Sequence, residues 1–165
     1  QTYESAVISL DLFSTFTAAA GFESKTEDSM NLLPYLKGEN AKAPHDYLYW
    51  RSGPTRAIRG SRWKMIQYKR STLVEADLNA TGRLDPPENG WGNETPDGMV
   101  TLLYDLSVDP FEQHNLAEEF PNIVGDLKAR FEKWNAELPT PDSAILPAVR
   151  STLTEFDGQA VQLIF

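Results

Sequence analysis

Seven cationic side chains gather in one window of the sequence that contains no acid. The window lies between Asp46 and Glu75, and its cations are Arg51, Arg56, Arg59, Arg62, Lys64, Lys69 and Arg70. The rest of the chain is strongly acidic, because the formal net charge of the whole is −9. A basic patch on an acidic body can bind an anionic ligand, or it can be a solvated strand face. The overall negative charge argues against a nucleic-acid-binding protein.

Few other residues could perform chemistry. The chain has two histidines and no cysteine, which excludes disulfides, a cysteine nucleophile and thiolate metal centres. His45 stands beside Asp46, where it could bind an anion, donate a proton or serve as a structural residue. His114 lies at an expected turn and is interpreted as a surface residue. Because no HExxH, P-loop, G-x-S-x-G or EF-hand pattern occurs, the sequence predicts no catalytic residue and no metal ligand in this chain.

The elements that would position the basic window are strands. Residues 47–52 alternate and are rich in aromatic side chains, residues 55–59 and 62–68 are typical of a hairpin, and residues 99–106 predict a fourth strand. Gly60-Ser61 suits a two-residue type II′ turn, which would place Arg59 opposite Arg62. The alternation of a strand places Trp50 and Arg51 on opposite faces of the sheet.

A helix should cover this sheet. Apolar residues recur at helical spacing between Pro121 and Leu138, and Pro139 ends the pattern. The segment 71–98 is irregular and is expected to be a long inserted loop, with glycosylation sequons at Asn79 and Asn93. The tail after residue 141 ends in a short apolar segment, 161–165, that could form an edge strand.

The N-terminal part predicts a helix of a different kind. Residues 7–21 are apolar on nearly all sides, with Ser9 as a candidate N-cap and Gly21 as the residue after the C-cap. Such a helix is buried, and in a chain of this size it is best explained as part of a larger body. We therefore expect residues 1–24 to belong to a main domain and residues 25–165 to form a smaller C-terminal subdomain. Gln1 is no initiator residue, so the chain is expected to be part of a longer protein. No apolar run in it reaches the roughly 20 residues of a membrane span, so no transmembrane helix is expected within these 165 residues.

Four segments in order resemble the C-terminal part of sulfatases of the arylsulfatase type, members of the alkaline phosphatase superfamily. SLDLFSTFTAAAG resembles the family pattern S-x-D-[LI]-x-P-T-x-x-x-x-A-G, with Ser14 in place of the usual proline. NLLPYLKGE is similar to the linker G-x-x-L-L-P-x-L-x-G-E. YLYWR followed by AIRGSRWKMI resembles the paired strands, and LLYDLSVDPFEQHNLAEEFP is similar to L-Y-D-L-x-x-D-P-x-E-x-x-N-L-A. The resemblance covers residues 5 to 138.

This resemblance implies a fold, and it implies that the catalytic residues lie in another part of the protein. The intact protein would have an α/β body of the alkaline phosphatase kind. This chain would be α+β, with about four antiparallel strands packed by a C-terminal helix, plus one helix of the larger body. The family's formylglycine nucleophile arises within Cys/Ser-x-Pro-Ser-Arg, and its calcium ion (Ca2+) is held by acidic residues of the preceding part. Neither set is carried by this chain, so its partner would be the N-terminal catalytic part of the same enzyme. The resemblance also implies a secreted, periplasmic or lysosomal location.

The expected activity is hydrolysis of sulfate esters, with a sulfated carbohydrate as substrate and this chain as scaffold and rim of the pocket. The rim candidates combine an aromatic platform with anion-binding groups; they are His45, Trp50, Arg51, Arg56 and Arg59. Two alternatives remain open. The intact protein could be a phosphonate or phosphate-ester hydrolase of the same superfamily, or the chain could be a non-catalytic carbohydrate-binding or interaction module.

Overall fold

The computed structural model describes residues 3–23, 26, 28–69, 88, 90, 92–139, 151–156 and 159–164. The chain divides into two compact units, Gln1–Phe131 and Glu132–Phe165. Within the described ranges no helix combines the length and the apolarity that a membrane span requires.

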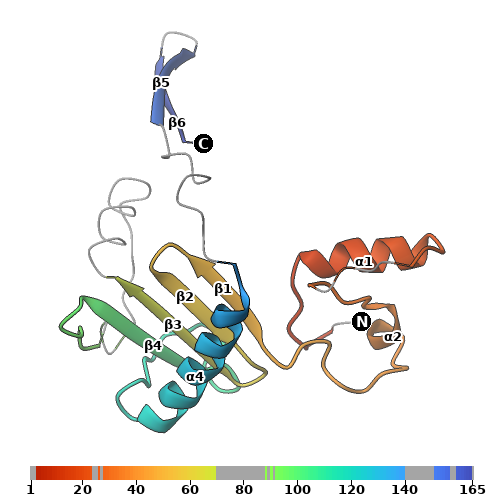
Figure 1. Ribbon diagram of the computed structural model, residues 1–165, viewed down its shortest axis with the longest axis horizontal. Coiled ribbons are helices and arrows are strands. Elements are labelled where there is room, and N and C mark those ends of the chain that lie inside the picture. Colours follow the sequence, from red (N-terminus) through yellow and green to blue (C-terminus); the bar gives the residue numbers. More distant parts are fainter. Residues whose placement is uncertain are drawn as a thin grey trace. The chain divides into compact units, whose positions relative to one another are not determined.

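A four-stranded antiparallel sheet forms the centre of the first unit (Figure 1). Its strands follow the order of the chain and are β1 (Leu48–Ser52), β2 (Thr55–Arg59), β3 (Trp63–Lys69) and β4 (Met99–Asp105). The four predicted strands are thereby confirmed within one residue at each end. Most of the inserted loop expected at 71–98 lies outside the described residues. Its last part, residues 92–98, returns to the sheet through a bridge between Glu94 and Val100.

The register of the β2–β3 hairpin differs from the predicted one. Arg59 lies opposite Lys64, not Arg62, and Ile58 lies opposite Met65. The amide of Gly60 donates to the carbonyl of Trp63 at 2.9 Å, so the pairing continues past Arg59 and leaves Ser61-Arg62 between the strands. The predicted position of the turn at Gly60-Ser61 was therefore wrong. The error is a shift of two residues, which leaves each side chain on its predicted face because side chains alternate with a period of two.

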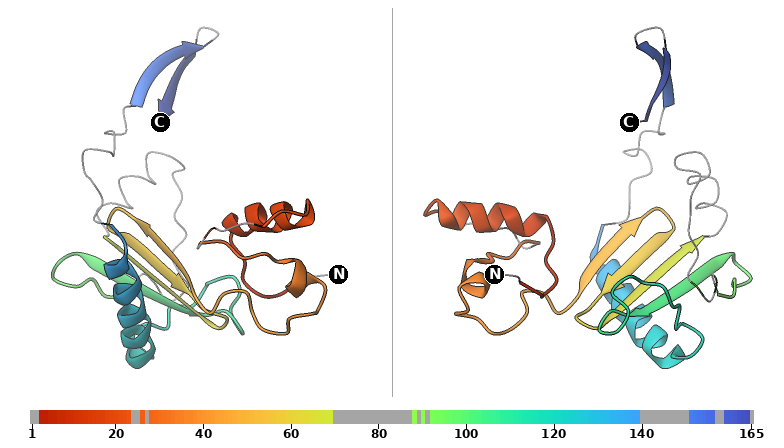
Figure 2. Two further views of the ribbon diagram at one scale, coloured as in Figure 1. Left: turned by 45° about the vertical axis from the view of Figure 1, so that its right-hand side comes forward. Right: turned by 180° about the vertical axis from the view of Figure 1, so that it is seen from behind.

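Helix α4 (Pro121–Glu137) covers one face of the sheet with its first turns (Figure 1, Figure 2). Its apolar stripe buries Leu127 and Phe131, which are 2% and 1% exposed. The ring of Phe131 lies 6.5 Å from that of Tyr49, and the guanidinium of Arg56 lies 5.9 Å from its centre. The predicted helix and its packing on the strands are confirmed.

The pairing of the strands defines two faces. We call the side that carries Tyr49, Arg51, Arg56, Ile58, Met65 and Leu103 the helix face, and the side that carries Leu48, Trp50, Arg59, Ile66 and Leu102 the opposite face. The opposite face has a core of its own, formed by Tyr68, Val100, Leu102 and Tyr104 with Ile66 and Leu106 packed against them. Both faces of β4 are therefore buried, and its sequence is accordingly apolar at almost every position.

An ion pair joins the β2–β3 turn to the end of β4. Arg62 donates from Nε and from a terminal nitrogen to one carboxylate oxygen of Asp105, at 2.9 and 2.6 Å. Asp105 is 4% exposed and also accepts from the amide and the hydroxyl of Ser107. These donors, Arg62 first among them, lower the pKa of Asp105 to about 2 against the cost of burial.

We expect acid to weaken this connection. The folded pKa of Asp105 lies below the value of about 3.9 of an unfolded aspartate, so its contribution to stability is complete above about pH 4. That contribution is lost as the pH falls through the folded pKa near 2. The difference in melting temperature between the wild type and Asp105→Asn should therefore shrink between about pH 4 and pH 2. Thermal denaturation across this range measures it, and a difference that stays constant would contradict the assignment.

Helix α1 (Leu10–Ala19) and the short helix α2 (Leu33–Leu36) precede the sheet. Helix α1 is shorter than the predicted 7–21, and Gly21 follows it with φ +83°, as expected for the residue after a C-cap. Ser9 makes no side-chain cap; the carboxylate of Asp11 accepts the amide of Ile8 instead. Leu10, Leu12, Phe13 and Phe16 are each 49–66% exposed in this chain. The prediction that residues 1–24 belong to a larger body is compatible with this apolar surface and stays a prediction.

The second unit contains a separate hairpin. Strands β5 (Ser151–Phe156) and β6 (Gln159–Ile164) pair antiparallel in a two-stranded sheet. The strand predicted at 161–165 is therefore present as part of β6. Its partner is β5, a strand that the sequence patterns did not indicate.

Candidate functional site

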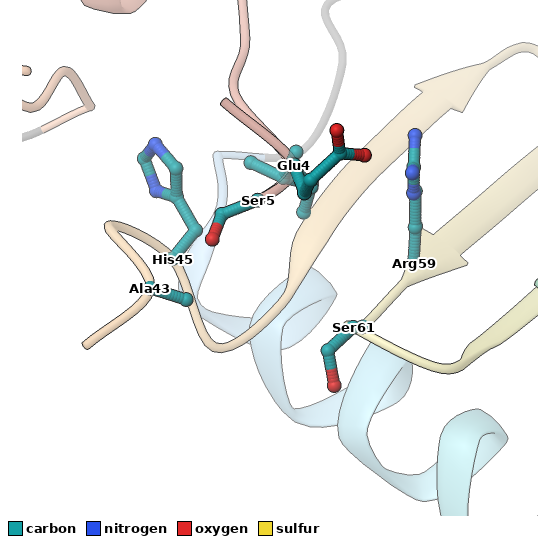
Figure 3. A pocket seen from close by; sticks show the side chains of 9 residues that line it. Glu4, Ser5, Ala43, His45, Arg59 and Ser61 are labelled. Atoms are coloured by element: carbon teal, nitrogen blue, oxygen red, sulfur yellow. The ribbon is translucent and has the colours of Figure 1, made fainter. Parts of the chain in front are cut away.

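A pocket of about 160 Å³ lies in the first unit where three segments meet (Figure 3). The segments are residues 4–6, which precede α1, residues 43–48, which lead into β1, and residues 59–61, which begin the β2–β3 turn. The pocket therefore brings the extreme N-terminal part of the chain against the basic window of the sequence. Its polar walls come from Glu4, Ser5, His45, Arg59 and Ser61.

Arg59 is the cation of this pocket. It is the last residue of β2 and lies on the opposite face, directly across from Leu48. Its Nε is buried and has no hydrogen-bond partner among the described residues. A buried donor without an acceptor costs free energy, so this nitrogen is chemically available to a ligand. An arginine offers a planar fork that fits carboxylate and sulfate oxygens.

Gly60 allows the turn to pass close to the chain that enters β1. A Cβ atom at this position would lie 3.0 Å from the Tyr47 ring, which is tighter than most Cβ contacts in proteins. A larger residue would therefore require the Tyr47 ring to shift by a few tenths of an ångström. Arg59 and Ser61, on either side, are held at the pocket by this close approach.

His45 is anchored to α1 by a buried carboxylate. Its Nε2 lies 2.9 and 3.0 Å from the two carboxylate oxygens of Asp11, which is 0% exposed. Asp11 also accepts the amides of Ile8 and Met30, both at 2.9 Å. Burial raises the pKa of Asp11, but the two amides and His45 outweigh burial and lower it. The ring of His45 points away from Arg59 (Figure 3), so His45 contributes to the wall and holds the segment before β1 in place.

The other predicted rim residues are divided between the two faces. Trp50 shares the opposite face with Arg59 and is 40% exposed, which leaves an aromatic platform on that side. Arg51 and Arg56 pair across β1 and β2 on the helix face, where Arg56 approaches Phe131. The structure thus brings His45 and Arg59 together, keeps Trp50 on their side of the sheet and places the other two arginines beside α4.

Four residues of the site were not singled out from the sequence: Glu4, Ser5, Asp11 and Ser61. The sequence could have indicated Asp11, because an isolated acidic residue in an apolar helix must either be exposed or have hydrogen-bond partners. Glu4, Ser5 and Ser61 carried none, since single polar residues in irregular segments are ordinary surface residues until the tertiary structure brings them together.

Neither a metal centre nor the family's nucleophile motif is found in the part of the chain that the structure covers. Within these described ranges no three acidic or histidine side chains converge as metal ligands would. The nearest sequence to the nucleophile motif is Ser52-Gly-Pro-Thr-Arg56, which differs from it at the fourth position. It forms the exposed β1–β2 turn, and Ser52 lies opposite Thr55 in the ladder.

Comparison with known proteins finds sulfatases among the similar sequences and structures, although no family model matches the chain. Arylsulfatase J of Mus musculus is 28% identical over 124 residues, which make up 72% of this chain and 20% of that protein. The ulvan-active sulfatase of Formosa agariphila is 28% identical over 138 residues, 75% of this chain and 28% of that protein. A solved 2-O GAG sulfatase matches with 25% identity and a TM-score of 0.50, covering 77% of this chain and 24% of that one.

The chain spans only 20–28% of the length of the curated relatives that it matches. The antiparallel sheet with its covering helix agrees with the α+β part expected of this family. In sequence and in fold, the chain is therefore similar to sulfatases over about three quarters of its length, which is consistent with the C-terminal region of such an enzyme.

Proposed function

We propose that the intact protein hydrolyses sulfate esters of a sulfated carbohydrate, and that this chain provides scaffold and one wall of the substrate pocket. The observation that carries the proposal is that the three curated relatives, which include arylsulfatase J and an ulvan-active sulfatase, are all sulfatases and each match 72–75% of the chain. The solved 2-O GAG sulfatase adds a relative whose substrate is a sulfated polysaccharide.

The chemistry of the reaction is assigned to the part of the protein that precedes this chain. A sulfatase needs a nucleophile and a cation that stabilises the charge developing on sulfate. The family supplies these as formylglycine and a calcium ion, and no residue of this chain is proposed for either role. By itself, this chain is expected to be inactive.

The rim is assigned to the opposite face of the sheet. Arg59 offers a guanidinium to sulfate or carboxylate, and Trp50 offers an exposed ring on which a sugar can stack. His45 supports this wall through Asp11. Arg51 and Arg56 pair on the helix face, so they are weaker candidates for direct contact.

The proposal predicts a clear substrate preference of the full-length protein. 4-Nitrophenyl sulfate should be hydrolysed faster than 4-nitrophenyl phosphate and phenyl phosphonate esters, and inorganic sulfate should be released from a sulfated polysaccharide. Colorimetric release of nitrophenol and ion chromatography of sulfate measure the two reactions. Preferential hydrolysis of the phosphate or phosphonate esters would point to the related hydrolases instead. Glycan binding without any ester hydrolysis would support the non-catalytic module.

A further inference from the structure

The pocket around Arg59 contains a cationic hydrogen-bond donor together with acceptor and hydroxyl groups. A ligand that satisfies both must carry a negative charge and hydroxyl groups. Arg59 offers hydrogen-bond donors and a positive charge, with its buried Nε lacking a partner among the residues described. Glu4 offers acceptor oxygens, while the hydroxyls of Ser5 and Ser61 can donate or accept. Figure 3 shows Glu4 and Arg59 on neighbouring sides of the hollow.

We propose that this pocket is a subsite for a single acidic sugar unit. Arg59 would bind the carboxylate or sulfate of that unit, and Glu4 with the two serines would bind its ring hydroxyls. The inference rests on the proposed function only in that it takes the sugar to be part of the enzyme's substrate. The inference adds that the substrate carries a second negative charge, on a sugar unit other than the one whose sulfate ester is hydrolysed.

The size of the pocket limits its occupant. Pockets for drug-sized ligands measure roughly 300–1,000 Å³, whereas this one measures about 160 Å³. It has room for one ring or one substituted end of a chain.

The charges select against a bare anion. Glu4 is exposed and carries a negative charge beside the guanidinium of Arg59, which reduces the attraction for a free inorganic anion. A sugar that carries an anion compensates because its hydroxyls donate to the Glu4 carboxylate. A neutral sugar lacks the group that would satisfy Arg59. The expected order of affinity is therefore glucuronate above both inorganic sulfate and glucose.

The test compares three probes on four forms of the full-length protein. Glucuronate, sodium sulfate and glucose are titrated by calorimetry at constant ionic strength into the wild type, Arg59→Met, Arg59→Lys and Lys42→Met. Lys42 is an exposed cation next to Ala43 in sequence that does not line the pocket, so Lys42→Met controls for the loss of one charge. Melting temperatures establish that each variant is folded.

We expect Arg59→Met to weaken the binding of glucuronate at least tenfold and to leave glucose within twofold. Arg59→Lys should recover part of the loss because it keeps the charge without the fork, and Lys42→Met should bind glucuronate as the wild type does. The proposal is overturned if Arg59→Met binds glucuronate within twofold of the wild type, or if both folded arginine variants lose glucose and glucuronate equally. It is also overturned if sulfate binds as tightly as glucuronate in an Arg59-dependent way.

Turnover of 4-nitrophenyl sulfate separates this inference from the proposed function. This substrate has no second charge, and the control variant Lys42→Met should hydrolyse it with the kcat and KM of the wild type. If the wild type shows no turnover but still binds glucuronate through Arg59, the sulfatase proposal fails and the acidic-sugar subsite stands. If turnover is present and the Arg59 dependence is absent, the opposite holds.

Discussion

Replacement of Asp11 by alanine is expected to destabilise the N-terminal part of this chain by at least about 3 kcal/mol, because three hydrogen-bond donors lose their acceptor. The carboxylate is 0% exposed and accepts hydrogen bonds from the amides of Ile8 and Met30 as well as from Nε2 of His45. Alanine would leave all three donors without an acceptor in the space that the carboxylate occupied. Each such buried donor costs about 1–3 kcal/mol.

Hydrogen exchange of the full-length protein measures this effect locally. The amides of Ile8 and Met30 should lose their protection in Asp11→Ala, and the peptide that contains His45 should exchange faster because its anchor is gone. Asp126→Ala is the matched control, since Asp126 pairs with Arg130 on the exposed surface of α4. It should leave these peptides unchanged. Equal protection at Ile8 and Met30 in the Asp11 variant and the wild type would contradict the anchoring role.

The anchor should also respond to acid in a defined direction. Because the hydrogen bonds outweigh burial, the pKa of Asp11 is lower in the folded protein than in the unfolded one. Its contribution to stability is then complete above about pH 4, the ordinary value of an aspartate, and is lost as the pH falls through the lower folded value. Faster exchange of the same peptides in acid, corrected for intrinsic rates, would accompany protonation.

Replacement of Phe131 by alanine is expected to cost about 3–5 kcal/mol, as for other buried phenylalanines. Phe131 is 1% exposed, and its ring contacts Tyr49 and the guanidinium of Arg56 on the helix face. The strands are held by hydrogen bonds and cannot move in to fill the volume of a missing ring, so a cavity would remain. Urea denaturation of the full-length protein, followed by exchange of β1 and β2 amides, measures the loss.

Phe111→Ala is the matched control, because it removes a phenyl ring that is exposed to solvent. Phe111 is 82% exposed, so its replacement should not change the unfolding of the sheet. A similar loss of stability in both variants would show that the effect belongs to the residue type, and the assignment of α4 as the cover of the helix face would then be wrong.

The sheet and its covering helix could be predicted from the sequence because each element is specified by the residues within it. Alternation between Tyr47 and Ser52, the turn residues after Arg59 and the apolar stripe from Val124 to Leu138 each specify an element without reference to distant parts of the chain. The family resemblance rested on the same segments, and the sulfatase relatives confirmed it. The predicted register of the β2–β3 hairpin was wrong because the turn lies at Ser61-Arg62, one residue later than the glycine had indicated.

The tertiary structure divides the arginines of the basic window between the two faces of the sheet. The sequence by itself determined that Arg51, Arg56 and Arg59 lie on strands, and that Trp50 and Arg51 face opposite ways. Only the packing of α4 decided that Arg51 and Arg56 lie on the helix's side of the sheet, because a strand has two faces and its own residues do not show which of them a later helix will cover. Likewise, Asp11 and His45 are 34 residues apart, and only the fold of the intervening chain makes one the anchor of the other.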